Sequence, residues 1–170
     1  MPEKVLVVKR DQWGAKYSAG RKAMPKPVAE VNIHHTVTPA TDDPCADMRT
    51  VERVLQSRDL APGYSFCIHP SGIILEGAGG NVGAHTAGRN SRSYGFSFIG
   101  NYDNMQPTWA QLAAAGYLIR VLQFTGFIVP DLATVTIQGH RATKATACPG
   151  ANLAPRMDAI RWFAGVTTPN

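Results

Sequence analysis

Segments with strand-like sequence alternate with segments of helical period along this chain, and this alternation constrains the fold more than any other feature. Strands are expected at residues 31–37, 63–69, 72–77, 94–101 and 133–140, and helices at residues 45–58, 109–124 and from 155 onward. The middle helix opens on a capping box, Thr108 with Gln111, and Gly126 and Pro130 end it. Its apolar face is expected to contain Trp109, Leu112, Ala115, Ile119 and Leu122. Because helices separate most of the strands, the pattern predicts a single α/β domain with a central mixed β-sheet flanked by helices.

The domain is expected to occupy residues 1–165. Residues 1–29 are predicted to form a mostly irregular N-terminal arm, because glycine and proline interrupt them, and residues 166–170 a tail or the start of a linker. A length of 170 residues suits one compact domain, and 44% hydrophobic with 17% charged residues is a globular composition. The first residues do not resemble a signal peptide, so we expect synthesis in the cytoplasm unless a targeting segment lies outside this chain.

Charge and cysteine content narrow the possible partners and the compartment. The formal net charge is +5 and the sequence pI is about 9.3, which favours polyanions such as nucleic acid, anionic lipid or an anionic cell wall. The positive charges are scattered and form no nucleic-acid-binding stripe, and no apolar run approaches the roughly 18 residues that span a bilayer. The odd number of cysteines, Cys45, Cys67 and Cys148, argues against a disulfide framework and for a reducing compartment.

The adjacent pair His34 and His35 lies in the first long strand-like segment. Successive side chains of a strand point to opposite faces, so one histidine belongs to an aliphatic face and the other to a polar face. The aliphatic set is Val31, Ile33, His35 and Val37, and the polar set is Asn32, His34, Thr36 and Thr38. His34 is therefore oriented as a ligand in a cleft would be, whereas His35 is expected to pack. Taken alone, the strand favours an ordinary polar-face histidine at position 34.

A second candidate segment, "GHRATKATACPG", places His140 just after a strand and Cys148 eight residues later, at the two ends of a loop. This spacing matches no zinc-finger pattern and is weak evidence by itself. His34 and His140 both lie near strand ends, where the sites of open α/β sheets gather. Two histidines and a thiolate would give zinc three ligands and one open position, which is typical of a catalytic site.

The ordered motifs "QWGA", "IHHT", "GYSF", "GAHTAGRN" and "GH" with "ACPG" resemble those of the zinc-dependent N-acetylmuramoyl-L-alanine amidases. This type 2 amidase and peptidoglycan recognition protein superfamily includes phage endolysins, and the resemblance covers about residues 11–153. It implies that His34, His140 and Cys148 bind one zinc ion and that Tyr64 and Thr146 are catalytic. Tyr64 shares a face with Phe66 and Ile68 by alternation, so a packed core tyrosine is nearly as well supported.

Two departures from the family pattern leave the general base unassigned. Some members carry a catalytic lysine where Thr146 stands, and Lys144 is two residues too early to replace it. Another subgroup uses a glutamate at the position of Ser97.

The resemblance also implies that His35, His85 and Asn90 line a substrate-binding groove, although the loop that carries His85 and Asn90 is equally consistent with a hydrogen-bonded turn. Outside these motifs, His69 is expected at the surface, and Cys45 and Cys67 are expected as small buried thiols. Animal recognition proteins often have a disulfide after the first histidine motif. Cys45 has no nearby cysteine, which favours a microbial or viral source.

The implied activity is hydrolysis of the amide between the lactyl group of N-acetylmuramic acid and L-alanine of the stem peptide. We expect a monomer that acts on bacterial peptidoglycan, with no nucleic-acid or membrane partner, and the missing signal peptide favours a phage endolysin made in the host cytoplasm. The alternatives are a peptidoglycan-binding module of the same fold without activity, and a thiol peptidase with Cys148 as nucleophile and His140 as base.

Overall fold

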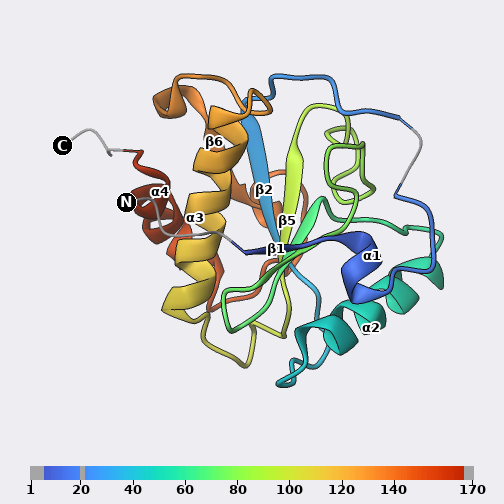
Figure 1. Cartoon of the computed structure of the whole chain (residues 1–170). Coiled ribbons are helices and arrows are strands. Elements are labelled where there is room, and N and C mark those ends of the chain that lie inside the picture. The colour runs from blue at the N-terminus through green and yellow to red at the C-terminus, as the bar shows by residue number, and fades with distance from the viewer. Residues whose placement is uncertain (1–5, 20–21, 167–170) are drawn as a thin grey trace.

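The computed structural model describes residues 6–19 and 22–166, which form a six-stranded mixed sheet flanked by helices (Figure 1). The strands are β1 (Val7–Val8), β2 (Glu30–His35), β3 (Phe66–Ile68), β4 (Ile74–Glu76), β5 (Tyr94–Phe98) and β6 (Thr136–Gly139). The helices are α1 (Arg10–Trp13), α2 (Pro44–Gln56), α3 (Trp109–Phe124) and α4 (Met157–Ala164), with short 3-10 helices at Leu132–Thr134, His140–Ala142 and Ala154–Arg156. The predicted fold class is confirmed.

The strand order is β1-β4-β3-β5-β2-β6, and only the β3–β4 pair is antiparallel among these strands. This pair forms a hairpin around residues 70–72. β2 lies between β5 and β6 and runs parallel to both, so Ser97 of β5 pairs with His34 and Gly139 of β6 pairs with Ile33. The end of β6 is therefore brought beside the end of β2.

Two apolar cores lie on opposite faces of the sheet. The larger core contains Val31 and Ile33 of β2 and is covered by α3 and α4, whereas the smaller contains Cys67 and Leu75 and is covered by α1 and α2 (Figure 1). Among the described residues, none from β2 or β6 belongs to the smaller core. The second face of the sheet at β2, β5 and β6 is left to polar side chains, which include Asn32, His34, Ser97 and Gln138.

The alternation along β2 is confirmed up to His35. His34 lies opposite the larger core, and His35 packs with its ring 6.5 Å from that of the buried Tyr102. The prediction that the strand continues to Val37 is wrong, because Val37 has a left-handed φ of 59° and its side chain is 57% exposed. The Thr36 hydroxyl accepts a hydrogen bond from the Thr38 amide at 3.3 Å at this turn, and such local side-chain bonds compete with regular strand structure.

Two predictions about single side chains are also wrong. Trp109 was expected on the apolar face of its helix, but it is the first residue of α3 and is 67% exposed. His69 was expected at the surface, but it is buried and its ring bridges two segments. His69 Nδ1 lies 2.7 Å from the Ser71 hydroxyl and Nε2 lies 2.8 Å from the Thr41 carbonyl oxygen. A partner 28 residues away in sequence makes this contact invisible to a local pattern.

The N-terminal arm is more regular than expected, since it contains β1 and α1. Trp13 is fully buried in the smaller core, and its indole nitrogen donates a hydrogen bond to the Glu76 carbonyl oxygen at 2.9 Å. The expected tail beyond Val166 lies outside the described residues.

The boundaries of the middle helix are as predicted. The capping box of Thr108 and Gln111 is present, and α3 ends at Phe124 as expected. The three cysteines, Cys45, Cys67 and Cys148, are free, although Cys45 is only partly buried. None of the described helices has the length and apolar character that a membrane span requires.

We expect Trp13→Ala to lower the free energy of unfolding by about 3–5 kcal/mol, because it leaves a large cavity between α1, α2 and the sheet. Trp13→Phe is the matched control, since it keeps most of the apolar contact and loses only the indole hydrogen bond. Urea denaturation of both variants measures the two losses. A cost for alanine no larger than that for phenylalanine would contradict the anchoring role of this side chain.

Candidate metal centre

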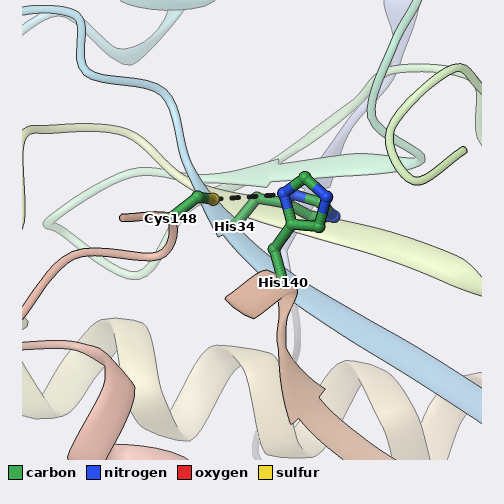
Figure 2. A group of neighbouring side chains, drawn as sticks. All are labelled: His34, His140 and Cys148. Carbon is green, nitrogen blue, oxygen red and sulfur yellow. Dashed lines mark hydrogen bonds between the residues drawn. The ribbon is translucent and has the colours of Figure 1, made fainter. Parts of the chain in front are cut away.

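His34, His140 and Cys148 come together on the sheet face opposite the larger core (Figure 2). His34 is near the end of β2, His140 directly follows β6, and Cys148 lies in the loop after the 3-10 helix His140–Ala142. The parallel register of β2 and β6 places His140 beside His34, with their ring centroids 4.5 Å apart. The three residues predicted as ligands are therefore neighbours in the fold.

The geometry of the group fits a tetrahedral metal ion such as zinc. One ligand atom from each residue lies within 4.8 Å of the others, and Cys148 Sγ is 3.6 Å from His34 Nδ1. A nitrogen and a sulfur bound to tetrahedral zinc at about 2.1 and 2.3 Å lie about 3.6 Å apart. His140 Nε2 is buried and has no hydrogen-bond partner among the described residues. A buried acceptor without a partner is costly, and a metal ion would satisfy it.

Burial sets the protonation of the three side chains. It lowers the pKa of His34 well below its usual value, with further lowering by His85, His140 and His35. Burial, followed by the charge of Lys144, also lowers the pKa of His140, so both imidazoles are neutral at pH 7. Burial raises the pKa of the Cys148 thiol to about 11, so this thiol has to lose its proton when a metal ion binds.

The structure places Tyr64 beside His34 and packs it against the smaller core, not in the larger core. β3 begins at Phe66, so Tyr64 precedes the strand and does not follow the alternation that places Phe66 and Ile68 in that core. The Tyr64 ring centroid is 5.3 Å from that of His34. Burial, with the neighbouring Cys148 sulfur, raises the pKa of Tyr64, so the phenol keeps its proton at neutral pH.

Thr146 and Ser97 lie beside the ligands. The Thr146 hydroxyl accepts a hydrogen bond from the Cys148 amide at 3.2 Å and so shapes the loop that presents the sulfur. Ser97 pairs with His34 in the sheet and is fully buried. Ser97, at the position where one subgroup of the family carries a glutamate, therefore lies beside the candidate metal ligand His34.

The three residues predicted to bind substrate, His35, His85 and Asn90, each make hydrogen bonds within the protein. Asn90 Oδ1 accepts hydrogen bonds from the amides of His85 and Thr86 at 2.9 and 2.7 Å, which is the hydrogen-bonded turn that the sequence left open. The His85 ring is buried 5.4 Å from the His34 ring, and burial lowers its pKa to about 4. His35 Nδ1 accepts a hydrogen bond from the Tyr102 amide. Their contact with a substrate stays a prediction.

Sequence reasoning missed Thr86 and Ser93. The Thr86 hydroxyl lies 3.2 Å from His34 Nε2, and the Ser93 carbonyl oxygen lies 3.3 Å from His85 Nε2. The only signal for Thr86 was its position beside His85 in "GAHT".

The chain is similar to N-acetylmuramoyl-L-alanine amidases and to peptidoglycan recognition proteins. Residues 24–151 match the family model described as N-acetylmuramoyl-L-alanine amidase. Human N-acetylmuramoyl-L-alanine amidase is 37% identical over 155 residues, which cover 83% of this chain and 26% of that protein. A peptidoglycan recognition protein from Bombyx mori is 36% identical over 155 residues, which cover 86% of this chain and 76% of that protein. The chain thus spans about a quarter of the human protein and three quarters of the silkworm protein.

The fold similarity is equally extensive. A solved structure of a Drosophila PGRP-LB mutant in complex with tracheal cytotoxin superposes with a TM-score of 0.82 at 32% identity. The superposition covers 91% of this chain and 95% of that chain.

The lowered histidine pKa values predict that the metal-free protein loses stability in acid. Above pH 6.5 these histidines are neutral in both the folded and the unfolded states, whereas below it only the unfolded chain takes up protons readily. The free energy of unfolding should therefore fall from about pH 6.5 to about pH 4, with His85 alone contributing up to about 1.4 kcal/mol per pH unit. Urea denaturation at several pH values measures the slope. His85→Gln should make it shallower, and equal stability at pH 5 and pH 7 would contradict the prediction.

Proposed function

The chain belongs to the N-acetylmuramoyl-L-alanine amidase family, and we propose that it is a zinc-dependent peptidoglycan hydrolase. The bond cleaved is the amide between the lactyl group of N-acetylmuramic acid and L-alanine of the stem peptide. One observation carries the proposal: His34, His140 and Cys148 each bring one ligand atom into a group sized for one metal ion, and His140 Nε2 has no hydrogen-bond partner among the described residues. A tracheal cytotoxin complex of a structural relative supports a peptidoglycan fragment as the ligand class.

Amide hydrolysis is slow because water is a poor nucleophile and the tetrahedral intermediate carries an oxyanion. Zinc held by His34, His140 and Cys148 would lower the pKa of a bound water to about 7 and polarise the carbonyl group. The three protein ligands leave one coordination position for this chemistry.

Tyr64 supplies a proton donor at the same place. Its raised pKa keeps the hydroxyl protonated at neutral pH, and its ring stands 5.3 Å from that of His34. The phenolic O–H donates to the developing oxyanion, where a fixed dipole stabilises charge without reorganisation. Thr146 uses its oxygen to accept from the Cys148 amide, which leaves its hydroxyl proton free to donate to the same intermediate.

The thiol peptidase alternative is poorly supported. A nucleophilic cysteine needs a lowered pKa, whereas burial raises that of Cys148 to about 11. In addition, the histidine nitrogen 3.6 Å from the sulfur belongs to His34 and not to His140, the base that this alternative requires.

The alternative that deserves a direct test is a peptidoglycan-binding module without activity, because relatives of this chain include recognition proteins. All three ligand positions and Tyr64 favour the enzyme. The proposal includes bacterial cell wall lysis by a monomer, as in an endolysin. The formal charge of +5 would aid retention on an anionic wall, an effect that salt weakens.

Purified peptidoglycan incubated with the zinc-loaded protein should release stem peptides with free L-alanine amino termini, and a chelator should abolish the release. His34→Ala should lose both bound zinc and activity, whereas the matched control His35→Ala should retain zinc, because His35 points to the other face of β2. Peptide release is followed by mass spectrometry and zinc by atomic absorption. Binding to peptidoglycan without any release of peptide would show that the protein is a binding module without activity. Equal loss of zinc in the two variants would contradict the assignment of His34 as a metal ligand.

Tyr64→Phe should lower kcat by about 10²–10³, the usual cost of removing one oxyanion donor, while zinc content and the thermal midpoint stay at the parent values. Steady-state kinetics on a soluble muramyl peptide separate kcat from KM. A kcat for Tyr64→Phe equal to that of the parent would show that the Tyr64 hydroxyl takes no part in the reaction.

A further inference from the structure

A chain of buried hydrogen bonds runs from His34 away from the metal site. His34 Nε2 lies 3.2 Å from the Thr86 hydroxyl, which lies 3.0 Å from His85 Nδ1. His85 Nε2 in turn lies 3.3 Å from the Ser93 carbonyl oxygen. Thr86 is 2% exposed and His34 is 1% exposed, so water does not compete for these bonds.

The direction of every bond follows from the last one. A carbonyl oxygen only accepts, so His85 Nε2 carries the proton and donates to Ser93. In a neutral imidazole the other nitrogen is then an acceptor, so the Thr86 hydroxyl donates to His85 Nδ1. The Thr86 oxygen is left to accept from His34 Nε2–H. His34 therefore has its lone pair at Nδ1, the atom that lies 3.6 Å from Cys148 Sγ.

The loop that carries this chain is tied down at several points. Asn90 Oδ1 accepts from the amides at both His85 and Thr86, so the two side chains of the relay start from a fixed backbone. Ser93 Oγ accepts from the Asn32 amide nitrogen at 3.0 Å, and Asn32 is two residues before His34 on β2. The loop and the strand that carries the ligand are thus held in one register.

An ion pair also joins the loop of residues 85–93 to the start of β2. The Arg89 guanidinium donates to the Glu30 carboxylate at 2.6 Å, and Glu30 is the first residue of β2. The relay is therefore part of a scaffold that connects the whole length of β2 with residues 85–93.

We propose that Thr86 is a positioning residue, which fixes the ring orientation and the Nε2–H tautomer of His34 so that Nδ1 is presented to the metal. This inference rests on the proposed function, in which His34 is a zinc ligand. Partners that orient a ligating histidine typically contribute 10- to 100-fold to metal affinity. His85 and Asn90 then support the metal ligand from behind.

The metal-free parent protein tests the direction of the relay without any variant or substrate. Long-range proton–nitrogen NMR spectra assign the protonated nitrogen of each histidine ring. We expect a proton at Nε2 and a bare Nδ1 in both His34 and His85. A proton at Nδ1 of His34 would overturn the proposal. This measurement tests the tautomer that Thr86 imposes on His34 even if the parent protein binds no zinc, an outcome that would defeat the proposed function and the metal-presenting role but not the hydrogen-bond relay.

Thr86→Val removes the hydroxyl and keeps the shape of the side chain. Its dissociation constant for zinc should rise 10- to 100-fold, measured by competition with a chelator, and its His34 Nε2 proton should exchange faster with water. Thr86→Ser, which keeps the hydroxyl, should stay near the parent in both measurements. Thr136→Val, an exposed change on the edge strand β6, controls for a generic threonine effect. Zinc affinity in Thr86→Val within threefold of the parent would overturn the positioning role.

Discussion

The parallel pairing of β2 with both β5 and β6 is the constraint on which the rest of this structure depends. It places Ser97 and His140 beside His34, although His34 and His140 are more than a hundred residues apart in sequence. Parallel strands need long crossover connections, and the residues that follow the strand ends then meet at one edge of the sheet. The loop to Cys148 completes the group from that edge (Figure 2).

The division of the sheet into two cores explains why a polar site can exist beside these strands. α1 and α2 cover only the part of one face that carries Cys67 and Leu75, so polar side chains occupy the rest of that face. Buried polar groups have to find hydrogen-bond partners, and the relay through Thr86 satisfies His34 on one side. His140 Nε2 is left without a partner among the described residues, which marks the other side as the place for a ligand.

A shared fold does not decide between binding and catalysis in this family, because the function resides in particular side chains. The distinction here depends on whether the three ligand atoms hold zinc and whether the Tyr64 hydroxyl meets an oxyanion. Both conditions require neutral imidazoles and a protonated phenol, and burial favours these protonation states at once. The low-dielectric surroundings that shift the pKa values also strengthen any interaction with developing charge.

Local patterns in the sequence determined the elements and the orientation of the histidine pair. Alternation on β2 separated His34 from His35, and the capping box at Thr108 set the start of α3, because both depend on neighbours in sequence. Long-range packing decided the rest. The burial of His69 and the relay through Thr86 involve partners 28 and 52 residues away, and Trp109 is exposed because its helix starts beyond the core. The residue types allowed a metal site, but only the register of three strands, set by burial of the opposite sheet face, brought their atoms within reach of one another.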